Sequence, residues 1–75
     1  MRHSLFFGTF DEANKAEKIV NGPGGPHVTD CFQSNDGESG LVEVRFFTDT
    51  PLGEFDQRYL LGKTKPDTYA LNCED

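Results

Sequence analysis

The sequence predicts a single α+β domain in which one antiparallel sheet carries one or two helices on one face. The chain has 75 residues, which is too few for more than one core. Its large apolar side chains include seven Phe, two Tyr and no Trp, enough for one layer of core between a sheet and its cover. A strand followed at once by a helix opens the chain, and an alternating strand occupies its middle.

The first strand–helix unit is expected within residues 4–21. Residues 4–10 are apolar and aromatic, as in a buried strand. The run Thr9-Phe10-Asp11-Glu12 follows the capping-box pattern, in which a Thr hydroxyl and a Glu carboxylate satisfy the first amides of a helix. Ala13, Ala16 and Val20 then recur at helical spacing, and a loop rich in Gly and Pro ends the helix.

A hairpin is expected next, with strands over residues 28–33 and 41–48. Asp36-Gly37 lies in the connection, because this dipeptide tolerates the positive φ angles of a tight turn. The later strand alternates, with Val42, Val44 and Phe46 on one face and Glu43 and Arg45 on the other.

The segment after this hairpin has two interpretations. Thr50-Pro51 is typical of a helix start, with Thr as N-cap and Pro at the first helical position, and Gly62 is a plausible stop. Leu52, Phe55 and Tyr59 would then share a helical face. Residues 55–61 also alternate as a strand would. We favour the helix, which gives the order βαββαβ; the alternative is βαββββ, and residues 68–73 form the last strand in both.

The order βαββαβ is that of ferredoxin-like folds, whose usual strand order is 4-1-3-2. Cys31 and Cys73 would then lie on opposite edges of the sheet, about 14 Å apart. That distance is too long for a disulfide, so we expect two free thiols.

Charge is distributed unevenly along the chain. The net charge is −6, and residues 21–57 carry all of the excess, with seven carboxylates against Arg45 alone. Such a field repels nucleic acids and anionic membranes and attracts basic surfaces. Acids at i and i+2 would stand about 6.8 Å apart on one side of an extended chain, as phosphates do along a nucleic acid. The predicted protein-binding residues are Asp36, Glu38, Glu43, Asp49, Glu54 and Asp56.

Catalytic and metal-binding chemistry is not expected. His27 and Cys31 lie four apart on a predicted strand, which does not bring them to one face, so we expect no metal and no cofactor. A cysteine-dependent enzyme is the remaining catalytic alternative. It is disfavoured because Asp30 precedes Cys31 and Glu74 follows Cys73, and neighbouring carboxylates raise the pKa of a thiol.

The aromatic pairs Phe6-Phe7 and Phe46-Phe47 must point to opposite faces of their strands, so one Phe of each pair leaves the core. RNA-recognition sheets of this topology use such rings to stack bases, but in positive surroundings. Core packing together with a protein interface is the more economical interpretation here.

In size, acidity, single-domain form and lack of catalytic residues, the whole chain resembles the small phage-encoded inhibitors of host defence, the anti-CRISPR proteins among them. The resemblance rests on no shared motif. It implies a non-catalytic inhibitor whose acidic surface mimics nucleic acid and blocks the basic DNA- or RNA-binding site of a defence effector, such as a CRISPR-Cas component, in the host cell cytoplasm.

A second resemblance covers the opening of the chain. Phe6-Phe7-Gly8-Thr9-Phe10, followed by Ala13 and Ala16, is similar to the start of SPOR domains, which are small peptidoglycan-binding βαββαβ modules. Phe47-Thr48-Asp49 departs from that pattern, and we expect neither an export signal nor a membrane anchor, so a cytoplasmic location is predicted. The oligomeric state stays open between monomer and homodimer, because an edge strand can pair with itself across a twofold axis.

Overall fold

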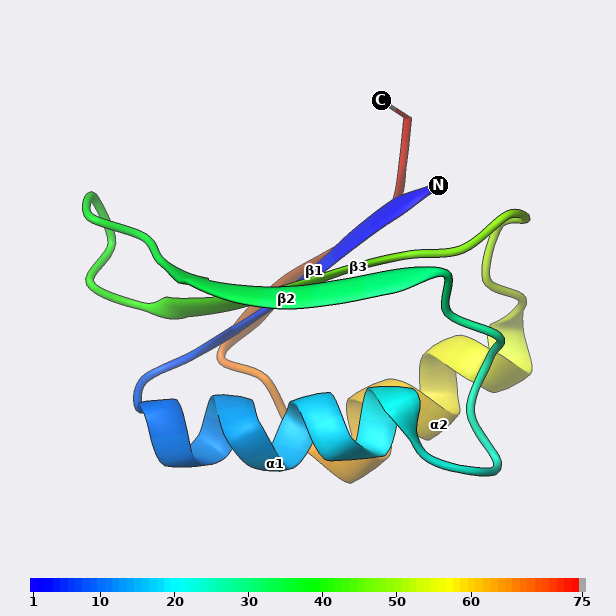
Figure 1. Cartoon of the computed structure of the whole chain (residues 1–75), viewed down its shortest axis with the longest axis horizontal. Helices are drawn as coiled ribbons and strands as arrows, with labels where there is room; N and C mark the ends of the chain where they lie inside the picture. Colours follow the sequence, from blue (N-terminus) through cyan, green and yellow to red (C-terminus); the bar gives the residue numbers. More distant parts are fainter. Residues whose placement is uncertain (75) are drawn as a thin grey trace.

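Six elements follow one another in the order strand, helix, strand, strand, helix, strand (Figure 1). The structure is a computed structural model and describes residues 1–74. Its strands are β1 (Arg2–Phe7), β2 (Asp30–Asn35), β3 (Val42–Phe47) and β4 (Thr68–Cys73), and its helices are α1 (Phe10–Asn21) and α2 (Glu54–Thr64). The predicted α+β class and the βαββαβ order are confirmed.

The four strands form one antiparallel sheet in the order β2-β3-β1-β4, which is the predicted ferredoxin-like order. Both helices cover the same face, and no element formed by residues 1–74 covers the opposite face (Figure 1). Cys31 of β2 and Cys73 of β4 lie on the two edge strands as free cysteines, as expected.

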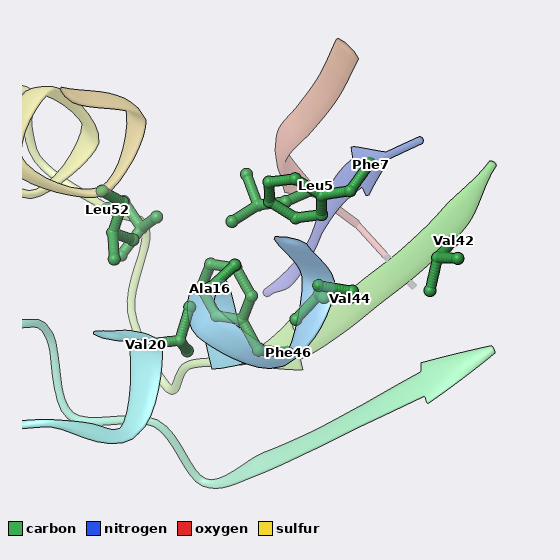
Figure 2. Close-up of a cluster of buried hydrophobic side chains, with 10 residues drawn as sticks. Leu5, Phe7, Ala16, Val20, Val42, Val44, Phe46 and Leu52 are labelled. Carbon is green, nitrogen blue, oxygen red and sulfur yellow. The ribbon is translucent and has the colours of Figure 1, made fainter. Parts of the chain in front are cut away.

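The core lies between the sheet and the helices. Its largest fully buried side chains include Phe7 of β1 and Phe46 of β3, packed with Val20 of α1 and Leu60 of α2 (Figure 2 shows most of this cluster). Ala13, Ala16 and Val20 are the buried residues of α1, as the helical spacing predicts.

The N-terminus of α1 is capped as the sequence predicts, with one difference. Thr9 Oγ1 accepts a hydrogen bond from the backbone N–H of Glu12 at 3.2 Å. The Glu12 carboxylate accepts from the Thr9 hydroxyl at 3.1 Å, not from the Thr9 backbone as in a full capping box.

The β2–β3 hairpin is confirmed, but its positive φ angle lies elsewhere than predicted. Asp36 accepts hydrogen bonds from the Glu38 backbone N–H at 3.1 Å and from the Ser39 hydroxyl at 2.8 Å. This Asx-type turn fixes the start of the connection. Gly40, with φ +74°, supplies the left-handed residue, whereas neither Asp36 nor Gly37 has a positive φ.

The second helix is confirmed, but its predicted boundaries were wrong. Gly53, not Thr50, is the N-cap, and no side chain caps the first turn. The reason is tertiary: Leu52 is buried, and its backbone N–H and C=O both bond the Asn72 side chain, at 2.7 and 3.1 Å. The helix also continues through Gly62 and ends at Thr64, and Lys65, with φ 49°, is its C-cap.

The predicted apolar face of α2 was wrong as well. Leu60 is its one fully buried residue, whereas Phe55 is 76% exposed. Leu52 is buried but lies before the helix, so it does not share a helical face with Phe55, and its burial does not bring Phe55 into the core.

Candidate functional site

The uncovered face of the sheet is the candidate site, and we call it the open face. Alternation along each strand places one set of side chains there, opposite the set that enters the core. The open face consists of Asp30, Phe32 and Ser34 of β2, Glu43, Arg45 and Phe47 of β3, Arg2, Ser4 and Phe6 of β1, and Thr68, Ala70 and Cys73 of β4.

The polar centre of the open face is built around Glu43. Its carboxylate accepts hydrogen bonds from the Ser4 hydroxyl at 2.6 Å and from Arg45 Nε at 2.9 Å and Nη2 at 3.2 Å. Partial burial opposes ionisation of Glu43, but the Arg45 and Ser4 hydrogen bonds and the charges of Arg45 and Arg2 outweigh it and hold the pKa of Glu43 below its ordinary value. The carboxylate is therefore ionised and held within the protein.

Aromatic rings flank this polar centre. Phe32 of β2 is 42% exposed, and its ring centroid lies 6.1 Å from that of Phe47 on β3. The guanidinium carbon of Arg45 lies 6.0 Å from the Phe32 centroid, within the range of a cation–π contact. Exposed aromatic rings together with an oriented Arg are the side chains that dominate binding energy in protein interfaces.

The structure divides the six predicted binding acids among separate places. Asp36 and Glu38 lie in the β2–β3 hairpin, at the end of the sheet where β1 finishes. Asp49 follows β3 at the opposite end, and Asp56 lines an open hollow of about 310 Å³ with it.

Two of the six acids are balanced by arginines of the chain itself. Glu43 pairs with Arg45, and Glu54 pairs with Arg58 one turn later in α2. The expected i, i+2 pairs do not lie in strands: Asp36 and Glu38 belong to a turn, and Glu54 and Asp56 to a helix. The six acids therefore do not form one row: Asp36, Glu38 and Asp49 lie beyond the ends of the open face, Glu43 lies within it, and Glu54 and Asp56 lie on α2.

The two groups best suited to nucleophilic or acid–base chemistry are used structurally. Burial, and then the charge of Glu17, raise the pKa of the Cys31 thiol to about 11, so it is protonated at neutral pH. His3 is fully buried and bonds Thr48 and the backbone of Asn72. Among residues 1–74, no group of three or more His, Cys, Asp or Glu is placed to hold a metal ion.

Sequence reasoning missed Phe32 and Ser4 as members of the site. The signal for Phe32 was present, since strict alternation along β2 places it opposite Cys31 and Gln33. Ser4 gave no signal, because its contact with Glu43 joins residues 39 positions apart.

Comparisons with known proteins identified no relative of the chain. No family model, no curated protein and no solved structure matches the chain. Within the described residues, no helix has the length and apolar character that a membrane span requires.

Proposed function

We propose that the protein is a non-catalytic binding protein whose open face docks a partner protein with a basic surface. The observation that carries the proposal is an uncovered sheet face on which Phe32 and Phe47 flank the ion pair of Glu43 and Arg45. In a fold whose helices cover only one side of the sheet, this is the largest surface that side chains of several strands build together.

The chemistry of the partner follows from the charge around the open face. Its centre is electrically balanced, because Glu43 and Arg45 neutralise each other. Asp36 and Glu38 make the hairpin end acidic, whereas Asp49 beyond β3 shares its end with Arg2 and the N-terminal amine. A fitting partner therefore offers apolar groups for Phe32 and Phe47 and Lys or Arg side chains toward the hairpin end, and long-range attraction to the net charge of −6 speeds the encounter.

The finer proposal is that the basic partner is a nucleic-acid-binding effector, of the kind that phage inhibitors disable, and that docking blocks its nucleic-acid site. Its support is the net charge of −6, which disfavours a direct nucleic-acid ligand and favours proteins that bind one. Because the acids lie at separate places, we propose that docking covers the nucleic-acid site of the partner and does not imitate a continuous row of phosphates.

The experiment compares three tagged baits in a lysate of the cell in which the protein acts: the wild type, Phe47→Ala and Phe55→Ala. Phe47 lies on the open face and Phe55 is exposed on the helical side, so the two variants remove the same side chain from opposite faces. We expect capture of the same protein by the wild type and Phe55→Ala, and at least a tenfold loss with Phe47→Ala. Equal capture by all three baits, or dependence on Phe55, would refute the open face as the site.

A second arm tests the finer proposal separately. The captured protein is loaded with a DNA or RNA oligonucleotide and then titrated with the wild type. Displacement of the oligonucleotide that weakens as salt rises supports blocking of a nucleic-acid site. A stable ternary complex would contradict inhibition by occupancy and leave the binding function in place.

A further inference from the structure

The two edges of the sheet differ in how well they can accept another strand. In β4, Leu71 and Asn72 together face the single residue His3, and Asn72 has φ 56°, so a bulge interrupts this edge. In β2, six consecutive residues pair regularly with β3. Natural edge strands are protected by charged side chains, Pro or a bulge. The β2 strand has no Lys, Pro or bulge, and its one charged side chain is Asp30, whose carboxylate accepts the Cys31 N–H and would have to release it on pairing.

The free backbone groups of β2 can be assigned from its pairing with β3. The Asp36 N–H donates to Leu41 O at 2.8 Å, and hydrogen-bonded and non-hydrogen-bonded positions alternate from there along the strand. Cys31, Gln33 and Asn35 therefore direct their N–H and C=O groups away from β3. The Cys31 N–H is turned to the Asp30 carboxylate, which accepts from it at 2.9 Å, in agreement with this assignment.

We propose that β2 pairs with β2 of a second copy of this chain, antiparallel, across a twofold axis at Phe32. The sheets of the two copies then join into one, with both open faces on the same side. This interface uses the edge of the sheet and needs no other protein, but it shares the Phe32 ring with the open face.

The register follows from two constraints. Backbone groups that point away from β3 must pair with the same kind of group in the second copy, and side chains of the open face must lie opposite side chains of the open face. These two constraints leave Cys31, Phe32 or Gln33 as the residue on the axis. Phe32 is the choice that places the exposed ring against the same ring of the second copy, at a non-hydrogen-bonded position where side chains approach most closely. Asp30 then lies opposite Ser34 of the second copy, so no like charges face each other across the two strands.

Helix α1 lies beside the β2 edge in the same arrangement. The Gln33 side chain donates to Asn14 Oδ1 at 2.8 Å and also forms a hydrogen bond with Glu17, and the charge of Glu17 raises the pKa of Cys31. Because Cys31 and Gln33 flank Phe32, Glu17 lies level with the proposed axis. A twofold axis there sets the two α1 helices antiparallel and brings Glu17 of one copy next to Glu17 of the other, a like-charge contact that salt screens.

An open hollow of about 540 Å³ lies along the same flank of α1 and would face the second copy. Its lining residues are Asn14, Glu17, Lys18 and Asn21. The second copy therefore meets polar groups and charges of both signs beside the paired strands.

The test is a pair of cysteine variants in a Cys31→Ser, Cys73→Ser background. Phe32→Cys places a thiol on the proposed axis, where it meets its own copy; Ser34→Cys places one on the same strand and face, but opposite Asp30 of the second copy. Under mild oxidation we expect Phe32→Cys to form a disulfide-linked dimer at least ten times more than Ser34→Cys. Equal cross-linking of the two variants, or none in Phe32→Cys, would overturn the register.

Light scattering of the wild type provides the second readout. We expect twice the monomer mass of 8.4 kDa, and a return to the monomer mass in Gln33→Pro, which removes an outward N–H and leaves the β2–β3 hydrogen bonds in place. Tyr69→Ala on the β4 edge removes a comparably exposed ring and should leave the dimer intact. A wild type that stays monomeric at every concentration tested would overturn the proposal.

Discussion

Replacement of His3 by Asn should remove a pH dependence of stability that the wild type shows below neutral pH. His3 is fully buried, and its Nδ1 accepts a hydrogen bond from the Asn72 backbone N–H at 2.9 Å. Its Nε2 lies 2.7 Å from Thr48 Oγ1, whose own hydroxyl donates to the Thr50 carbonyl at 2.7 Å. This chain of donors and acceptors is complete only for the neutral ring, because a proton on Nδ1 would oppose the Asn72 N–H.

The direction of the effect follows from the pKa of His3. Burial lowers this pKa, and the positive charge of the N-terminal amine lowers it further. The unfolded chain therefore binds a proton at a higher pH than the folded chain does. Stability is therefore complete above the unfolded value of about 6.5 and declines as the pH falls below it. One proton limits the slope to about 1.4 kcal/mol per pH unit. That is a large share of the roughly 4–11 kcal/mol expected for a domain of this length.

Urea unfolding at pH 7.5, 6.5 and 5.5 measures the effect. Between the last two, the wild-type midpoint should fall by up to about 1 M, since a small domain has an m-value of about 1–3 kcal/mol per M. His3→Asn keeps an acceptor for Asn72 but loses the ring stacked on Phe46 at 4.9 Å, so it should cost about 2–3 kcal/mol at pH 7.5 and then show a flatter profile.

The control is His27→Asn, which changes the exposed histidine of the α1–β2 loop and should keep the wild-type slope. Glu43 and Asp36, whose pKa values are lowered, stabilise the fold above their unfolded values near 4 and lose that contribution only at lower pH. Equal slopes in the wild type and His3→Asn would refute the reasoning.

Four further outcomes are expected. Leu60→Ala should cost about 2–5 kcal/mol in chemical unfolding, because it empties a fully buried site between α2 and the sheet; a cost below 1 kcal/mol would contradict the packing. Thr9→Ala should cost about 1 kcal/mol through loss of the α1 cap, and Thr9→Ser should restore most of it. Lys65→Gly should stabilise the protein by about 0.5–1 kcal/mol, because Lys65 holds a left-handed conformation that glycine adopts without strain; an unchanged or lower midpoint would count against this. Cys31 in a Cys73→Ser background should react with iodoacetamide at pH 8 more slowly when folded than in urea, and equal rates would show that its thiol is not shielded.

Local patterns were sufficient to predict most of the fold. The alternation of Val42, Val44 and Phe46 fixed one face of β3, and the spacing of Ala13 and Ala16 fixed the buried face of α1. These signals repeat within a few residues, and the sequence displays them directly.

The errors arose where long-range contacts decide local structure. Thr50-Pro51 has the chemistry of a helix start, but the Asn72 side chain holds the backbone of Leu52 twenty residues away and delays the helix to Glu54. Nothing near His3 in the sequence indicates a buried histidine that joins β1 to Thr48 and to β4.

The candidate site was predicted only in part. Counting charge located the acidic segment, but it could not show that a turn and a helix would carry Asp36, Glu38, Glu54 and Asp56 to different places. The ion pair between Glu43 and Arg45 could be predicted from the sequence, since residues at i and i+2 of a strand share a face.

The seven phenylalanines provide the most direct test of the open face as the binding surface, because the fold distributes them over three environments. Phe6, Phe32 and Phe47 lie on the open face, Phe7 and Phe46 in the core, and Phe10 and Phe55 are exposed on the helices. With ¹³C-labelled Phe, addition of the captured partner should shift the ring resonances of the first group and leave Phe10 and Phe55 unchanged. Shifts confined to Phe10 and Phe55 would contradict the account.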